Sequence, residues 1–151
     1  MTIVPVTENN LMDAAFVHAE AWRTSHRNIC SPDFVAAHTT QRQAAYLQSE
    51  LAKGKMLWLL CDPQPTGLVS VWNDVIENLY VLPALQRRGY GTRLLRFAMT
   101  QCSVPTLWVL NSNEIALQLY LKEGFIPSGR RKILNERLFE QELVYHPTGG
   151  Q

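Results

Sequence analysis

Hydrophobic and polar positions near the N-terminus predict a strand followed by helices. Residues 2–6 form a short β-rich run that ends at four polar residues. Ser31-Pro32-Asp33 is typical of a helix start, because serine can cap free N–H groups and proline fits the first helical position. A further helix is predicted over residues 41–52. The first helix is indicated by a face at helical spacing, made by Leu11, Ala14, Ala15, His18 and Trp22.

The middle of the chain changes to the pattern of a three-stranded meander. Apolar runs at residues 56–61, 68–72 and 75–82 are separated by short segments rich in Asp, Asn, Pro and Gly. Pro83 ends the third run, and a helix is expected to begin close to Gly89. One face of that helix is marked by Leu94, Leu95, Ala98 and Met99.

The C-terminal third again alternates strand and helix. Residues 106–110 read as a strand and residues 113–122 as a helix, with Gly124 at the place of a left-handed C-cap. Two further strands are expected near residues 125–130 and 138–145.

Composition places this pattern in one α/β domain. The chain has 151 residues, of which 46% are hydrophobic, enough for one buried core. We expect the domain to cover residues 1–146, with residues 147–151 as a disordered tail. The formal net charge is only +1, so neither nucleic acid nor an anionic membrane is indicated as a partner. With no basic and apolar leader and no long apolar stretch, we expect a cytoplasmic protein without a membrane span.

Cysteine and histidine positions indicate no metal or disulfide chemistry. Cys30, Cys61 and Cys102 are odd in number and contain no CxxC pair, which fits a reducing compartment. The four histidines show no ligand spacing, so we expect no metal site.

A glycine-containing turn joins the meander to the following helix, with the sequence Gln86-Arg87-Arg88-Gly89-Tyr90-Gly91-Thr92. Helix N-termini expose free N–H groups, and glycines let several amides point at one anion, so a phosphate or pyrophosphate is the expected ligand. Arg87 and Arg88 add positive charge for phosphate oxygens, including a ribose 3′-phosphate such as that of CoA. A plain tight turn is the alternative. Neither the Walker nor the three-glycine dinucleotide pattern is complete here.

The flanking sequence resembles the GNAT superfamily of N-acetyltransferases. The turn fits the family's acetyl-CoA motif, Gln/Arg-x-x-Gly-x-Gly/Ala, and directly follows Leu79-Tyr80-Val81-Leu82-Pro83. Downstream, Asn113 with Ala116, then Tyr120, then Gly124-Phe125 resemble the second family signature. Residues 19–23 and 31–35 look like the acceptor-side helices of many bacterial members.

This resemblance implies a fold and a cosubstrate. The implied fold is a mixed, mostly antiparallel central sheet of six to seven strands, flanked by about four helices. The sheet would be splayed in a V between its fourth and fifth strands. Acetyl-CoA would lie in the V, with its pantetheine arm pairing with the backbone near Val81. No metal is implied.

The resemblance also implies roles for individual residues. Tyr120 would protonate the leaving thiolate, unless it only packs on the cofactor or the core. Asn113 would hydrogen-bond the pantetheine arm, or cap its helix, or do both. The cofactor contacts implied are Leu79, Tyr80, Val81, Gln86, Arg87, Arg88, Gly89, Tyr90, Gly91, Thr92, Asn113 and Tyr120.

The amine must lose a proton before it attacks, and Glu77 is the candidate base. Strand parity predicts that Glu77 points to the same face as Leu79 and Val81. A solvated or ion-paired glutamate is the alternative, since the family's best-known base position falls nearer Val75. Trp22 is a candidate for the acceptor pocket, together with Tyr80, although large aromatic residues are more often core.

The expected activity is direct transfer of the acetyl group from acetyl-CoA to a primary amine of a small molecule or peptide, without a covalent acyl-enzyme. The alternative is a catalytically silent acyl-CoA sensor or interaction module with the same fold. The near-neutral net charge argues against a strongly acidic pocket for polycations. A homodimer is common among relatives, and the sequence leaves it open.

Overall fold

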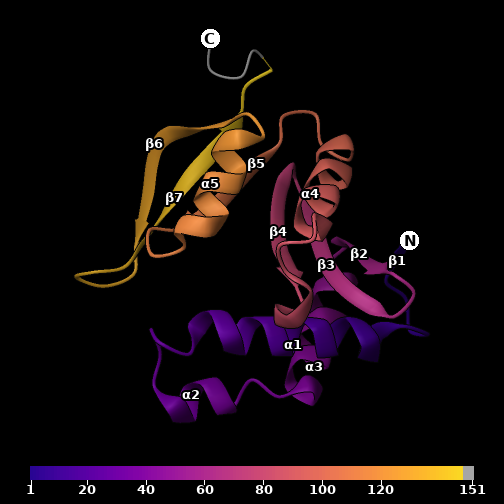
Figure 1. Ribbon diagram of the computed structural model, residues 1–151. Coiled ribbons are helices and arrows are strands. Elements are labelled where there is room, and N and C mark those ends of the chain that lie inside the picture. The colour runs from indigo at the N-terminus through magenta and orange to yellow at the C-terminus, as the bar shows by residue number, and fades with distance from the viewer. Residues whose placement is uncertain (148–151) are drawn as a thin grey trace.

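A seven-stranded sheet organises the chain in the computed structural model, which describes residues 1–147 (Figure 1). Of the predicted disordered tail, residues 147–151, only Pro147 is described, and residues 148–151 lie outside the described part. The strand order is β1-β2-β3-β4-β5-β7-β6, and the predicted α/β class and mixed sheet are confirmed. The strands are β1 (Thr2–Pro5), β2 (Met56–Cys61), β3 (Pro65–Trp72), β4 (Val75–Val81), β5 (Thr106–Leu110), β6 (Phe125–Ile133) and β7 (Phe139–Tyr145).

Residues 1–147 form five α-helices, against about four predicted. The additional one is the short helix at Pro32, which the sequence indicated only as a helical turn. Ser31 caps it by accepting a hydrogen bond from the N–H of Phe34 at 3.3 Å, as expected. The helices are α1 (Leu11–His26), α2 (Pro32–Ala36), α3 (Thr40–Ala52), α4 (Tyr90–Thr100) and α5 (Glu114–Lys122), with a 3-10 turn η1 (Pro83–Leu85) after β4.

The sheet splays between β4 and β5. These two strands pair in parallel, whereas the other neighbouring strands pair antiparallel. Their pairing extends over two residue pairs, Val75 with Thr106 and Ile76 with Leu107. Beyond these pairs the strands part, and β6, β7 and α5 stand apart from β2 to β4 (Figure 1). The V-shaped opening implied by the family resemblance is therefore present.

Two apolar clusters lie on opposite faces of the sheet. One joins β2 to β5 with α4 and α5, and includes Leu94, Leu95, Leu107 and Phe125. The other joins α1 and α3 to the sheet around Leu47. Burying aliphatic and aromatic side chains on both faces holds the two halves of the V in place.

A β-bulge interrupts β4 where the V opens. Ser70 pairs with Glu77, but Leu68 pairs with Tyr80, so β4 contains one residue more than β3 across this interval. Asn78 lies in the interval with φ of +53°, a left-handed conformation that asparagine tolerates better than most residues.

This bulge makes the strand-parity prediction wrong. Because one additional residue reverses the alternation, Glu77 shares a face with Tyr80 and not with Val81. Val81 belongs to the cluster under α4, and Leu79 packs against that cluster. Glu77 and Tyr80 lie on the face covered by α1 and α3, because their β3 partners do.

None of the helices formed by residues 1–147 combines the length and the apolar character needed to cross a bilayer.

Candidate active site

The turn of residues 86–92, here called the phosphate turn, connects η1 to α4. Gly89 is the N-cap residue of α4, with φ of +88°, and Arg87 has φ of +66°. Glycine adopts such a conformation without steric cost, whereas side chains with a Cβ do so rarely. The two left-handed residues bend the chain sharply from the end of β4 into the helix.

The phosphate turn has the features of an anion site. Within residues 1–147, no protein acceptor receives the N–H groups of Tyr90, Gly91 and Thr92, and no side chain caps α4. A Cβ placed on Gly89 would meet no atom within 4 Å, so the space in front of the turn is open. Free N–H groups at the start of an 11-residue helix bind phosphate well.

The phosphate turn also carries two arginine side chains. Arg87 and Arg88 are exposed, and neither forms an ion pair with any described residue. Two unpaired guanidinium groups beside free N–H groups fit the phosphates of CoA.

Two other residues of the phosphate turn use their side chains to hold it in place. Gln86 donates from Nε2 to the carbonyl oxygen of Val81 at 3.2 Å. Tyr90 donates its hydroxyl to Oδ2 of Asp62 at 2.6 Å, which ties α4 to the turn between β2 and β3. That hydrogen bond lowers the pKa of Asp62. Tyr90 therefore has its backbone N–H, and not its phenol, available to a ligand.

Helix α4 and helix α5 approach each other beside the end of β4. A Cβ on Gly91 would lie 3.9 Å from both Val81 and Leu119. Tyr120 follows Leu119, is 8% exposed, and belongs to the cluster with Phe125. Burial raises the pKa of Tyr120 to about 12. The phenol is thus protonated throughout the physiological range and able to donate.

Asn113 caps α5. Its Oδ1 accepts a hydrogen bond from the N–H of Ala116 at 3.2 Å, so the capping alternative is present. Its side-chain Nδ2 has no acceptor among the described residues, which leaves the predicted contact to a cofactor available.

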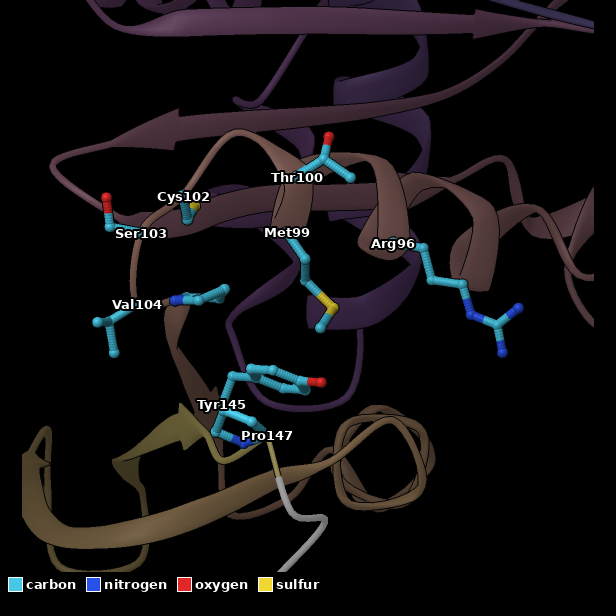
Figure 2. A pocket seen from close by; sticks show the side chains of 9 residues that line it. Arg96, Met99, Thr100, Cys102, Ser103, Val104, Tyr145 and Pro147 are labelled. Carbon is cyan, nitrogen blue, oxygen red and sulfur yellow. The ribbon is translucent and has the colours of Figure 1, made fainter.

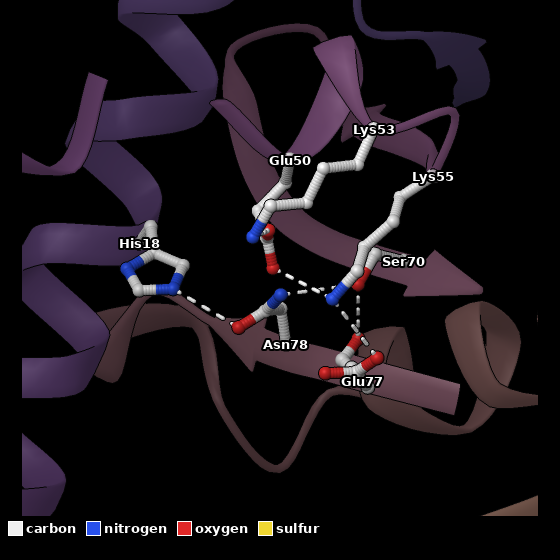
Figure 3. A network of polar contacts seen from close by, with 7 residues as sticks. All are labelled: His18, Glu50, Lys53, Lys55, Ser70, Glu77 and Asn78. Atoms are coloured by element: carbon white, nitrogen blue, oxygen red, sulfur yellow. Dashed lines mark hydrogen bonds and ion pairs between the residues drawn. The ribbon is translucent and has the colours of Figure 1, made fainter. Parts of the chain in front are cut away.

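A chain of hydrogen bonds runs past the β4 bulge on the sheet face covered by α1 and α3, here called the acceptor face after the acceptor-side helices expected from the sequence (Figure 3). Gln43 Nε2 lies 2.8 Å from Nδ1 of His18, and His18 Nε2 lies 3.2 Å from Oδ1 of Asn78. Asn78 then donates to Ser70 Oγ at 3.1 Å, and Ser70 donates to the carbonyl oxygen of Glu77 at 3.1 Å. In this direction every donor meets an acceptor if His18 is neutral with its proton on Nε2.

His18 is neutral for an electrostatic reason as well. Burial lowers its pKa, and the positive charges that His38 and His26 can carry lower it further, against the hydrogen bond to Asn78. The sequence placed His18 only on a helix face, and its partners Gln43 and Asn78 lie 25 and 60 residues away.

Glu77 is ion-paired, as the alternative interpretation predicted. Its Oε1 lies 3.4 Å from Nζ of Lys55, and the same Nζ lies 2.7 Å from Oε1 of Glu50 (Figure 3). Burial would raise the pKa of Glu50, but hydrogen bonds from Lys55, Lys53 and Tyr46 lower it overall. The Glu77 side chain remains 34% exposed, so it is accessible from the acceptor face.

A cavity of about 220 Å³ lies on the acceptor face, here called the acceptor cavity. Trp22 forms one wall, stacked between the rings of His26 and His38 at 4.0 and 3.6 Å between centroids. Trp22 and Tyr80, both considered for this role from the sequence, thus line one cavity. The remaining lining residues, which sequence reasoning missed, are His18, His38, Arg42, Gln43, Tyr46 and Asn78.

A larger cavity, of about 410 Å³, lies at the other end of α4 (Figure 2). Met99, Cys102 and Tyr145 line it, far along the helix from the phosphate turn. Burial raises the pKa of the Cys102 thiol to about 11, so this thiol is not a ready nucleophile. In the part of the chain that the structure describes, no three His, Cys, Asp or Glu side chains gather as a metal-binding group.

Comparison with known proteins agrees with this geometry. Two solved structures share the fold: PaiA N-acetyltransferase from Thermoplasma acidophilum in complex with coenzyme A, and YncA, a putative acetyltransferase from Salmonella typhimurium, with acetyl-CoA. The first has a TM-score of 0.70 at 18% identity, covering 96% of this chain and 100% of that one. The second has a TM-score of 0.70 at 17% identity, covering 97% and 93%.

Sequence comparison is more specific. A probable N-acetyltransferase of Mycobacterium tuberculosis is 30% identical over 131 residues, which span 77% of this chain and 74% of that protein. Residues 53–127, which include β4, the phosphate turn and Tyr120, match the acetyltransferase (GNAT) domain family. The chain therefore belongs to the GNAT acetyltransferase family.

Proposed function

We propose that this protein transfers the acetyl group of acetyl-CoA to a primary amine of a small molecule or peptide. The observation that carries the proposal is the position of two sites around the end of β4. The phosphate turn, with free N–H groups and two unpaired arginines, follows this strand. The acceptor cavity opens on the opposite face at the bulge, and includes Asn78 and Tyr80 of the same strand.

The residues of the phosphate turn would hold the cosubstrate. The N–H groups of Tyr90, Gly91 and Thr92 would bind the pyrophosphate, and Arg87 and Arg88 would neutralise further phosphate charge. The backbone of Leu79 to Val81 and the Asn113 amide are the proposed contacts of the pantetheine arm. Acetyl-CoA supplies the thioester whose carbonyl carbon the amine attacks.

Two side chains would handle the protons. Glu77 lies on the acceptor face of β4 and is partly exposed, so we propose that it takes the proton of the incoming ammonium, directly or through water. Lys55 would keep the carboxylate oriented. Tyr120 would give its proton to the leaving thiolate. Burial that raises the pKa of the phenol also raises that of a buried thiolate, so the two basicities stay comparable.

One observation favours the alternative of a catalytically silent acyl-CoA sensor. Glu77 is already paired with Lys55, and Tyr120 already packs in the core. A binding module would need neither group for chemistry. Turnover separates the two functions, because only the enzyme releases free CoA thiol when an amine is added.

Calorimetric titration with acetyl-CoA, and with ATP for comparison, tests the cosubstrate. In Gly89→Val, a β-branched residue must adopt φ of +88°, so acetyl-CoA affinity should fall about ten- to hundredfold, as expected for roughly 1–3 kcal/mol of backbone strain. Gly91→Ala is the matched control, because its Cβ would make only ordinary contacts at 3.9 Å. Failure of the folded wild-type protein to bind acetyl-CoA would refute the proposal.

A further inference from the structure

The acceptor cavity carries an unbalanced positive charge. Arg42 is the one Lys, Arg, Asp or Glu among its eight lining residues. None of the described carboxylates forms an ion pair with Arg42. The arginine nearby on α1, Arg23, is already paired with Glu20 and with the carbonyl oxygen of His38. Arg42 is therefore a guanidinium available to a ligand.

The carboxylates near the cavity do not line it, including Glu140 of β7, whose charge acts on the Tyr80 phenol. Glu50 and Glu77 lie on α3 and β4, the elements that supply Tyr46 and Asn78, but both are bound to Lys55 and neither lines the cavity. A diamine or polyamine would bring a second positive charge to a cavity that offers an arginine and no carboxylate. Arg42 is exposed, so solvent weakens the repulsion, but its charge still disfavours a second cation in the same cavity.

Helix α3 carries Arg42 and Tyr46 at different heights beside the cavity. Arg42 precedes Tyr46 by one turn of α3, about 6 Å along the helix axis. Tyr46 lines the cavity together with Asn78 at the bulge, and a hydrogen bond with Asn78 opposes the rise that burial causes in the pKa of the Tyr46 phenol. A ligand with an anion at Arg42 can thus extend past the rings of Trp22 and Tyr46 and reach β4 with its other end.

Size and wall chemistry limit the ligand further. At about 220 Å³ the cavity is smaller than the usual drug-sized pocket of about 300–1,000 Å³. The stacked Trp22, His26 and His38 rings form a rigid wall that needs little ordering when a ligand binds.

We infer that the acceptor is a small amine that carries an anionic group, a carboxylate or a phosphate, which Arg42 binds while the aromatic rings hold the body of the molecule. The inference rests on the proposed transferase function and narrows its acceptor. Arg42 is the specificity-determining residue, and polyamines are excluded as preferred acceptors.

Matched pairs of amines test this inference through CoA thiol release. The probes are L-phenylalanine with L-phenylalaninamide, L-methionine with L-methioninamide, O-phosphoethanolamine with ethanolamine, and spermidine. The first two pairs test a carboxylate and the third a phosphate. We expect kcat/KM for one anionic member to exceed that of its neutral partner at least about tenfold, as expected for one charge-assisted contact.

Variants of Arg42 locate the effect. Arg42→Gln should lower kcat/KM for the preferred anionic amine about 10- to 100-fold and leave the neutral partner unchanged. Arg42→Lys should give a kcat/KM between those of the wild type and Arg42→Gln, because lysine keeps the charge but cannot make a bidentate contact. Arg27→Gln is the control and should behave as wild type. Arg27 is an exposed arginine at the C-cap of α1 and does not line the cavity.

Several results would overturn the inference and leave the proposed function standing. These are equal or better turnover of the neutral amines or of spermidine, or an Arg42→Gln loss that is the same for both members of a pair. Turnover of none of the probes by a protein that binds acetyl-CoA would overturn the inference and favour the sensor alternative. Absence of acetyl-CoA binding would instead refute the proposed function, and the inference with it.

Discussion

The phosphate turn and the acceptor cavity lie around the same strand end but are built by opposite means. The turn presents backbone N–H groups, and its shape depends on the left-handed φ of Gly89 and Arg87. The cavity presents side chains, contributed by α1, the segment before α3, α3 itself and β4. A site made of backbone depends on local conformation, whereas a site made of side chains depends on tertiary packing and can change its ligand by substitution.

This difference suits the two ligands of the proposed reaction. The cosubstrate is constant, and main-chain amides bind its phosphates whatever the neighbouring side chains are. The acceptor varies between members of a fold, and exchangeable side chains can follow that variation. The Asn78 bulge is the point where the two regions meet, because its hydrogen bonds hold His18 and Ser70 on the acceptor face while β4 continues to Val81.

Tyr120→Phe is expected to give the largest effect that separates binding from chemistry. Loss of the proton donor should lower kcat about 100-fold or more, within the range of general acid catalysis. Acetyl-CoA affinity should stay within about threefold, since the phosphate turn is intact. Because burial raises the pKa of Tyr120 to about 12, the wild-type rate should show no loss from this group below pH 11. A parallel fall in acetyl-CoA affinity would show that Tyr120 supports the binding site.

Glu77→Gln is expected to give a smaller loss that depends on pH. At pH 7 kcat/KM should fall about 10- to 100-fold, because most of the amine is protonated and needs a base. The loss should shrink as the pH approaches the pKa of the acceptor amine, about 8 for an α-amino group. A merely structural role, through the Lys55 ion pair, would instead give a loss that is the same at every pH. Acetyl-CoA titration of the same variant serves as the control.

His18→Gln tests the stability of the acceptor side. The substitution weakens the hydrogen bonds to Gln43 on α3 and Asn78 on β4, which should lower the unfolding free energy by about 1–3 kcal/mol at pH 7.5. Because burial lowers the folded-state pKa of His18, the unfolded chain binds more protons than the folded chain once the pH falls below about 6.5. Wild-type stability should therefore be full above that pH and fall as the solution becomes more acidic, and the variant should show a flatter profile.

Denaturant unfolding between pH 7.5 and 5.5 measures this effect. Burial also lowers the pKa of His26, so His26→Gln is the matched variant and should flatten the profile in part. The lowered pKa of Glu50 affects stability in another pH range. Its contribution to the unfolding free energy is present above about pH 4.5 and is lost only as the pH falls further. A wild-type profile that is flat down to pH 5.5 would contradict the neutral state of His18.

The same difference explains what the sequence could predict. The phosphate turn is contiguous, and Gly89, the polar turn and the apolar helix face after it all follow from local chemistry. The acceptor cavity joins residues from position 18 to position 80, and nothing local links Arg42 or Tyr46 to β4. The bulge could not be predicted either, because the alternation in residues 75–82 gives no sign of the additional residue at Asn78. The face predicted for the Glu77 side chain was therefore wrong.

Asn113 allows the smallest and sharpest test, because its two proposed roles use different atoms. Its Oδ1 caps α5, and its Nδ2 would contact the cofactor arm. Asn113→Ala removes both and should lower the unfolding free energy by about 1 kcal/mol. Asn113→Asp keeps the capping oxygen and loses the amide donor, so stability should stay near that of wild type while acetyl-CoA affinity falls a few-fold. Unchanged affinity in a stable Asn113→Asp variant would assign this residue to the helix alone, and the recognition of acetyl-CoA on this side of the V would then rest on backbone groups, as proposed for the phosphate turn.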